Sequence, residues 1–178
     1  MAQGFSPAIV NALIGAASDS EPMVRATAVR SLGLLDDRKL VPILTAHLVD
    51  PVRVVRVRAA EALLNLAITT LDGPAGQALA TAQDEWMASL RTFDDTAYNH
   101  VTLSRLASAR GQADEAIREL NIAIRLDPGD ARPHVSQGIL AARAGRYADA
   151  AREFRKAKAL APTYPNIDRL IEEAERRR

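Results

Sequence analysis

Apolar residues recur at helical spacing along almost the whole chain. Ile167, Leu170, Ile171 and Ala174, for example, fall on one face of a helix whose other face is charged. Alternating runs of Val, Ile and Thr, which would indicate strands, are missing, and only 4% of the residues are aromatic. The pattern therefore predicts an all-α protein with about ten helices.

The N-terminal part repeats itself at an offset of 31 residues. Residues 19–35 align with residues 50–66, and the residues before them align at the same offset. The aligned pairs are Asp19 with Asp50, Val24 with Val55, Arg25 with Arg56, Ala28 with Ala59, Leu32 with Leu63, Ile9 with Leu40, Val10 with Val41 and Leu13 with Leu44. Each unit is expected to be a helix pair, with Asp at the turn and Pro22 or Pro51 near the next helix start.

The C-terminal part repeats with a period of 34 residues. The units are residues 97–130 and 131–164, and each contains a glycine that ends its first helix and a proline that stops its second. The aligned positions are Gly111 with Gly145, Ala107 with Ala141, Ala116 with Ala150, Leu120 with Phe154, Ala123 with Ala157 and Pro128 with Pro162. The small residues are expected to let the two helices of a unit approach closely.

On these residues, the N-terminal pairs resemble short HEAT-like repeats and the C-terminal units resemble tetratricopeptide repeats. The resemblance implies a right-handed α-solenoid, in which Arg25 and Arg56 bond the turn of a neighbouring repeat. The tetratricopeptide pattern is altered at its first signature position, where His100 and His134 replace Trp. It is also altered at the eighth position of each unit, which holds Ser104 or Gly138.

These repeats divide the chain into four segments. We expect two HEAT-like helix pairs in residues 1–70, a linking segment in 71–96, two tetratricopeptide units in 97–164, and a capping helix in 165–178. After a Gly-Pro breaker, the linker reads as one helix from about Ala75 to Arg91. Its apolar positions are expected to join the two arrays; they are Leu79, Trp86 and Leu90.

The first helix, around Pro7–Ala17, does not look like the end of a solenoid. It has no charged residue, although a terminal repeat needs a polar outer face. We therefore expect something to cover it. Upstream sequence is the first candidate, and a partner chain or self-association is the second.

No set of residues in the sequence forms a recognisable catalytic motif. The chain has no Cys, so it has neither thiolate metal ligands nor a CxxCH haem attachment, and it lacks the common nucleotide, zinc-protease and hydrolase motifs.

His100 and His134 share a repeat position, so their helix axes are expected about 8–10 Å apart, too far for a shared metal. We interpret them as packing residues, with a role at a partner surface as the alternative. Asp94 and Asp95 are interpreted as helix-capping residues rather than a carboxylate pair. We therefore expect no enzyme activity, metal or cofactor.

The best candidate site is the concave face that the first helices of tetratricopeptide units line. The resemblance places seven partner-binding residues there: Tyr98, Val101, Arg105, Arg132, Val135, Ile139 and Arg143. Ser108, Ala109 and Ala142 lie between them. This set is apolar with three arginines and no acid, so it suits a peptide with Asp, Glu or a free carboxylate. The alternative is an ordinary solvated face. Val101, Arg105, Val135 and Ile139 differ from the Lys and Asn of the chaperone-binding subclass, whose specificity is not expected here.

Charge and hydropathy exclude other partner classes. Residues 1–96 contain 8 Lys and Arg against 11 Asp and Glu, and residues 97–178 contain 15 against 11. Neither half is basic enough to favour a nucleic acid. No uncharged run is long and apolar enough for a membrane span.

The order of repeats, together with the sequence DPVRVVRVRAAEALLNL at residues 50–66, resembles the C-terminal region of certain bacterial multihaem c-type cytochromes. Two functional hypotheses follow. The first is a non-enzymatic scaffold that binds a protein or peptide on its concave face. The second, implied by the cytochrome resemblance, is the interaction tail of a periplasmic electron-transfer protein whose haem-binding part lies elsewhere. The compartment would be cytoplasmic in the first case and periplasmic in the second.

Overall fold

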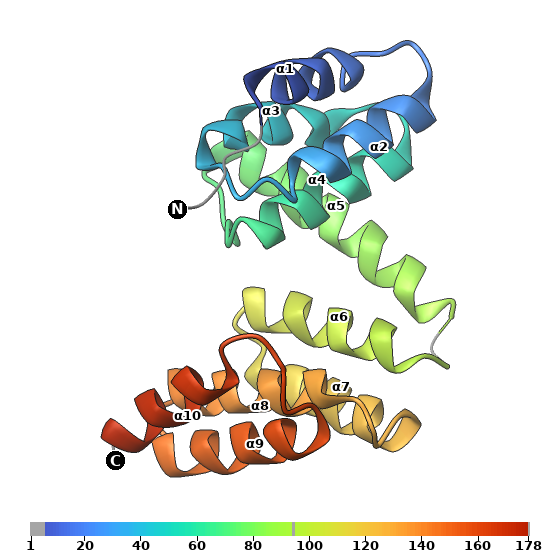
Figure 1. The fold of residues 1–178 in the computed structure, drawn as a ribbon. Coiled ribbons are helices and arrows are strands. Elements are labelled where there is room, and N and C mark those ends of the chain that lie inside the picture. The colour runs from blue at the N-terminus through green and yellow to red at the C-terminus, as the bar shows by residue number, and fades with distance from the viewer. Residues whose placement is uncertain (1–5, 94, 178) are drawn as a thin grey trace. The chain divides into compact units, whose positions relative to one another are not determined.

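A computed structural model describes residues 6–93 and 95–177. These residues form ten α-helices and two short 3-10 segments, and no strand occurs among them. The chain divides into two compact units, Met1–Ala88 (unit 1) and Ser89–Arg178 (unit 2), coloured blue to green and green to red in Figure 1. The prediction of an all-α protein built from helix pairs is confirmed.

Unit 1 contains the helices of the 31-residue repeats. They are α1 (Pro7–Ala16), α2 (Pro22–Leu32), η1 (Arg38–Leu40), α3 (Val41–Ala46), η2 (His47–Val49) and α4 (Arg53–Asn65), and most of α5 (Gly73–Arg91) follows. Both α1 and α2 begin with proline, whose missing N–H costs nothing in the first helical turn. Helices α2 and α4 approach closely, since a Cβ added to Gly33 would lie 2.3 Å from Ala62 Cβ.

The second pair of unit 1 departs from the first in its opening helix. Where α1 is continuous, the aligned residues form η1, α3 and η2. The two ring nitrogens of His47 lie 2.8 Å from the backbone oxygens of Ile43 and Ala17. These contacts tie the end of α3 to the residue that caps α1.

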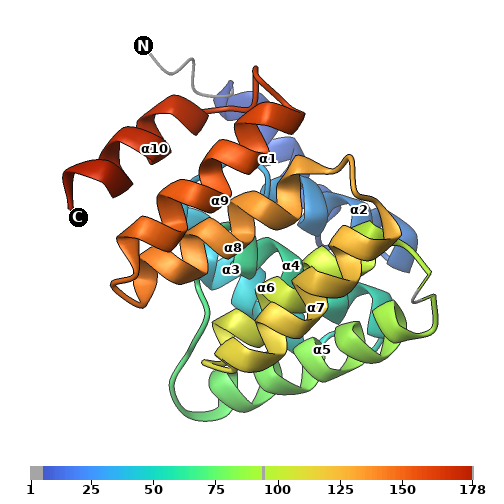
Figure 2. The ribbon, with the colours of Figure 1, turned by 90° about the horizontal axis from the view of Figure 1, so that it is seen from below.

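Unit 2 contains the helices of the 34-residue repeats. They are α6 (Ala97–Ala109), α7 (Ala113–Leu126), α8 (Ala131–Arg143), α9 (Tyr147–Leu160) and α10 (Ile167–Arg176). Helix α6 packs against α7 and α8 against α9, while α10 lies along α9 at the edge of the unit (Figure 2). Gly111 and Gly145 follow α6 and α8 with φ values of +73° and +74°, a conformation that favours glycine.

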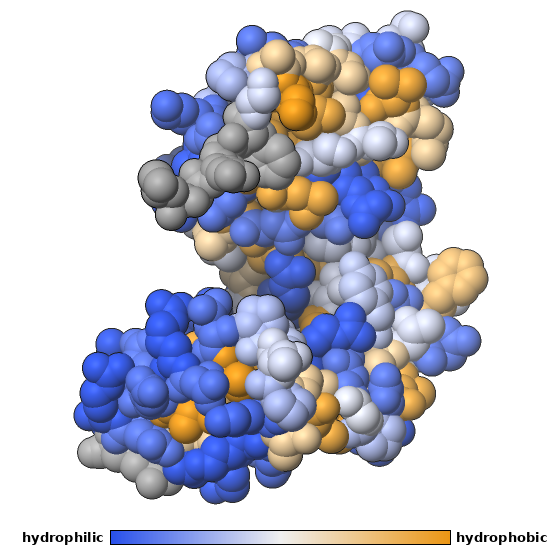
Figure 3. All heavy atoms as spheres, in the orientation of Figure 1, coloured by the Kyte–Doolittle hydropathy of each residue, from blue (hydrophilic) through white to orange (hydrophobic). Residues whose placement is uncertain are grey.

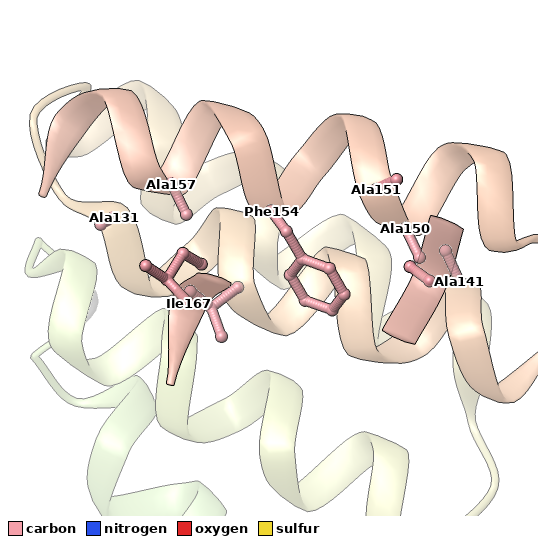
Figure 4. Packing of buried hydrophobic residues seen from close by; sticks show 9 residues of the cluster. Ala131, Ala141, Ala150, Ala151, Phe154, Ala157 and Ile167 are labelled. Atoms are coloured by element: carbon pink, nitrogen blue, oxygen red, sulfur yellow. The ribbon is translucent and has the colours of Figure 1, made fainter. Parts of the chain in front are cut away.

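A large apolar side chain fills the second repeat of unit 2. Phe154 is 2% exposed and lies among the small residues of α8 and α9, next to Ile167 (Figure 4). A Cβ added to Gly138 would lie 2.4 Å from the Phe154 ring. The first repeat has Ser104 and Leu120 at these positions, so a larger residue on one helix is matched by a smaller residue on the other.

Helix α5 begins two residues before the predicted start and ends at the predicted Arg91. Leu79 and Trp86 are buried and Leu90 is half-buried, as their apolar character requires. The role of this helix in joining the two arrays stays a prediction.

Candidate partner-binding face

Exposed side chains of α6, α8 and α10 form one surface of unit 2, which we call the groove face. Two contacts join its first two helices. The Arg132 guanidinium lies 5.8 Å from the centre of the Tyr98 ring, and Arg143 Nη1 donates to Ser108 Oγ at 3.3 Å. The structure therefore brings together residues at equivalent positions of consecutive repeats, 34 residues apart (Tyr98 and Arg132), or one position from equivalence, 35 residues apart (Ser108 and Arg143).

The predicted site residues divide into an exposed and a buried set. Tyr98 is 54% exposed and Ile139 is 36% exposed, and the three arginines of the prediction are exposed as well. Val101 and Val135 are buried in the two hydrophobic clusters of unit 2. Helical spacing placed these valines on the same face, but their short side chains pack inward. They support the face rather than offer contact surface.

Arg132 is neutralised by an acid that the repeat positions did not include. Its side chain donates to Asp130 with N–O distances of 2.8–2.9 Å, and its backbone N–H donates to the same carboxylate at 2.9 Å. Burial raises the pKa of Asp130, but these hydrogen bonds outweigh burial and leave the pKa below its ordinary value. The expectation of three arginines without a nearby acid is therefore wrong for Arg132.

A pocket lies at the end of the groove face, between α8, α9 and α10. Its volume is about 290 Å³. We call it the end pocket; its lining is Ile139, Ala142, Arg143, Tyr147, Phe154, Leu170, Glu173, Ala174 and Arg177. Figure 3 shows apolar surface emerging between hydrophilic side chains over this part of unit 2. Sequence reasoning found Ile139 and Arg143 but missed the contribution of α10, which it treated only as a cap.

The charged groups of the end pocket differ in their partners. Arg177 pairs with Glu173 at 3.2 Å, and its guanidinium lies 5.8 Å from the centre of the Tyr147 ring. A hydrogen bond to Tyr147 raises the pKa of Arg177. Arg143 instead contacts the neutral Ser108 hydroxyl. The pocket thus has one cation whose hydrogen-bond partner is uncharged.

Each of the two repeat histidines is paired with a glutamate of the second helix of its repeat. His100 Nδ1 lies 2.6 Å from a carboxylate oxygen of Glu119, and His134 Nδ1 lies 2.9 Å from one of Glu153. The first pair is buried, so His100 does not reach a partner surface. Since Glu119 and Glu153 are themselves 34 residues apart, the repeat offset was the signal that could have identified them. Within the described ranges, no three His, Cys, Asp or Glu side chains come together as a metal site.

Arg25 forms the predicted bond to the turn of the neighbouring repeat, whereas Arg56 bonds its own turn and helix α5. Arg25 makes two hydrogen bonds to the Asp50 carboxylate, at 2.9 and 3.0 Å, and also donates to the backbone oxygens of Asp19 and Ser20. Arg56 donates to the backbone oxygen of Asp50 and pairs with Glu85 of α5. Glu85 was missed because it lies 35 residues after Asp50 and so outside the 31-residue offset.

Asp95 does not cap helix α6. The N-cap residue is Thr96, whose hydroxyl accepts from the Asn99 backbone N–H at 3.3 Å. Asp95 is exposed, and Asp94 lies outside the described residues. The capping prediction for Asp95 is wrong because a hydroxyl stands one position closer to the helix.

Helix α1 has no buried residue, and Ile9 is 50% exposed. Figure 3 shows apolar surface over α1 and α2. Part of the apolar surface of this helix is therefore exposed, in keeping with its lack of charged residues.

Comparison with known families agrees with both repeat assignments. Residues 2–64 match HEAT repeats, and residues 101–165 match tetratricopeptide repeats. No curated protein matches the chain. Over the part of the chain that the structure describes, none of the helices combines the length and apolar character that crossing a membrane requires.

Proposed function

We propose that this chain is a non-enzymatic repeat scaffold that holds a protein or peptide partner on the groove face. Proteins built from HEAT and tetratricopeptide repeats commonly use extended surfaces to bind other proteins. The observation that carries the proposal is the exposed row of Tyr98, Arg132, Ile139 and Arg143 across two consecutive repeats. Exposed aromatic and arginine side chains are the types enriched in protein interfaces.

The chemistry of the face favours an extended or helical peptide with acidic groups. Asp130 already neutralises Arg132, which leaves Arg143 as the better candidate for a carboxylate of the partner. Tyr98 and Ile139 would provide apolar contact on either side of these charges. The partner is therefore expected to alternate acidic and apolar residues.

Site-directed photo-crosslinking tests this proposal. A benzophenone amino acid placed at Tyr98 or Ile139 should capture one and the same protein from the native source. The same amino acid at Leu160, which is 41% exposed on α9, is the control. Arg143→Glu should abolish capture at Ile139. Equal capture at Leu160, or capture unaffected by the charge reversal, would contradict a specific groove face.

The surface of α1 is a second candidate contact. We infer that another protein surface or a second copy of the chain covers it, because an exposed helix without a charged residue is unusual on a solvated surface. Light scattering should show association that Ile9→Glu reverses. A monomer at all concentrations, with no binding of an apolar dye, would argue against this contact.

The order of the repeats supports an alternative function. In this chain HEAT repeats precede tetratricopeptide repeats. On the resemblance of that order to the tail of multihaem cytochromes, we infer as the alternative that the chain serves as the interaction part of an electron-transfer protein. The 178 residues contain no Cys and cannot attach haem through a CxxCH motif, so any haem would be attached outside them. Mass and visible absorption of the polypeptide isolated with an antibody from its source separate the two functions. Haem bands would favour the alternative, and a colourless chain would favour the free-standing scaffold.

A further inference from the structure

We propose that the end pocket binds a large apolar side chain of a peptide, and that Arg143 binds the carboxylate of an acidic residue next to it. This inference rests on the proposed scaffold function and specifies one site on the groove face. Nothing in the repeat pattern assigns the pocket, because α10 provides part of its lining.

The size of the pocket limits what can enter. Its volume of about 290 Å³ is near the lower end of the range for ligand sites in proteins, about 300 Å³. That space is enough for one phenylalanine, leucine or methionine side chain, and too small for a packed helix. The rest of the peptide would have to lie outside the pocket, along α6 and α8.

The walls of the pocket favour an apolar occupant. Ile139 and Ala142 come from α8, Phe154 comes from α9, and Leu170 and Ala174 come from α10. Phe154 is almost completely buried, whereas 36% of the Ile139 surface is exposed to solvent. An entering side chain would cover Ile139 and exclude water from apolar surface, which is the main source of favourable free energy in such contacts.

The charges around the pocket favour a carboxylate beside that side chain. Glu173 and Arg177 neutralise each other, and Arg177 also contacts Tyr147. Arg143 is exposed, and its partner among the described residues is the Ser108 hydroxyl at 3.3 Å. A carboxylate would give Arg143 a charged acceptor in place of a long contact to a neutral one. A lysine or arginine at the same place would be repelled.

A pair of matched peptides tests the assignment. Both are acetylated and amidated, so that their ends have no charge, and they contain Phe-Asp or Phe-Asn at their centre. Binding to the isotope-labelled full chain is followed by nuclear magnetic resonance through the methyl groups of Ile139 and Leu170. We expect saturable shifts of both methyl groups, with the Phe-Asp peptide binding about fivefold more tightly. A Phe-Lys peptide should bind more weakly than either.

Two variants separate the apolar and charged parts of the site. Ala142→Trp should fill the pocket and abolish binding of both peptides, while Ala148→Trp, on an exposed position of α9 outside the pocket, should preserve it. Arg143→Gln should make the two peptides bind equally, whereas Arg146→Gln should leave the preference unchanged. Amide spectra show whether each variant is folded, and Ile139→Glu is a second way to block the pocket if Ala142→Trp unfolds the unit.

The outcomes distinguish this inference from the scaffold function. Absence of methyl shifts, or shifts that survive both blocking variants, would overturn the pocket assignment. If crosslinking at Tyr98 and Ile139 still captured a partner, the scaffold function would stand without the pocket. Saturable binding that does not distinguish Asp from Asn would overturn the role of Arg143.

Discussion

In unit 1 the ion pairs of Arg25 and Arg56 join a repeat to the element that follows it, whereas in unit 2 the two His–Glu pairs join the helices within a repeat. Arg25 reaches the turn of the following repeat at Asp50, and Arg56 reaches Glu85 on α5. In unit 2, His100 pairs with Glu119 across α6 and α7. His134 pairs with Glu153 in the same way across α8 and α9.

The close contacts at two glycines follow the same division. Gly33 meets Ala62 between the second helices of consecutive repeats, and Gly138 meets Phe154 between two helices of one repeat. The two units therefore differ in which helices their closest contacts join. Unit 1 depends on contacts between neighbours, while each repeat of unit 2 is a more self-contained helix pair. The groove face of unit 2 consequently lies on repeats whose internal packing does not require the partner.

The largest expected effect comes from breaking the buried His100–Glu119 pair. His100→Leu would leave the Glu119 carboxylate buried without this partner, and we expect a loss of about 4 kcal/mol in the free energy of unfolding of unit 2. His134→Leu should cost about half as much, because Glu153 also pairs with Lys156 at 2.9 Å. Amide hydrogen exchange in α6–α9 measures both. Equal effects of the two substitutions would contradict the compensation of Glu153 by Lys156.

Gly33→Ala should destabilise unit 1 by about 3 kcal/mol. The added Cβ would lie 2.3 Å from Ala62 Cβ and 2.5 Å from its Cα, so the backbones of α2 and α4 would have to separate. Denaturant unfolding followed by fluorescence reports on unit 1, since Trp86 is the only tryptophan. Adding Ala62→Gly should not restore stability because the Cα clash remains. If Ala62→Gly fully restored the stability of the Gly33→Ala variant, helices α2 and α4 could separate at little cost, contrary to this prediction.

Gly138→Ser should cost about 2 kcal/mol because its Cβ would overlap the buried Phe154 ring. Unlike the Gly33 variant, this one should be rescued by Phe154→Leu, which reproduces the Ser104 and Leu120 combination of the first repeat. Near-ultraviolet circular dichroism of the tyrosines, all in unit 2, follows the unfolding. Gly129→Ser, in the same unit, is the control, since its added Cβ would lie at an ordinary contact distance of 3.4 Å from Asp127 Oδ1. If the losses in the free energy of unfolding from Gly138→Ser and Phe154→Leu simply added, the two positions would not be matched in size.

The smallest expected effect is a change in acid sensitivity of unit 1. Hydrogen bonds from Arg25 outweigh partial burial and hold the pKa of Asp50 below its ordinary value. A lowered folded pKa stabilises the protein above the unfolded value of about 3.9, and this contribution is lost as pH falls through the lower folded pKa. Arg25→Gln should therefore reduce stability at pH 7 and flatten its decline in acid, as measured by Trp86 fluorescence. Arg30→Gln, which changes an exposed arginine on the same helix, should leave the slope unchanged.

Much of the fold could be predicted because it is periodic. The 34-residue offset located the starts of α6 and α8, and the resemblance to HEAT-like repeats identified the bond between Arg25 and Asp50. The contacts that were missed involve residues outside the repeat signatures. Glu85 lies on a helix of different spacing, and the glutamates that pair with the histidines occupy positions where sequence alone indicates a solvated charge.

The candidate site was predictable only in part for a related reason. Repeat positions place Val135 and Ile139 on the same helix, but they do not show which of them is buried. The acid that neutralises Arg132 comes from the preceding turn, and the far wall of the end pocket comes from α10. The position of this acid and of this pocket wall depends on packing between elements, which the sequence pattern of a single repeat does not predict.

The most direct test of the account is a selection of random peptides displayed on phage against the immobilised full chain. Bound phage are then tested against a folded Ile139→Glu variant. The account predicts recovered peptides with a large apolar residue beside Asp or Glu, and loss of their binding to the variant. Peptides without that pattern, or peptides that bind the variant equally well, would contradict the groove face as the binding surface.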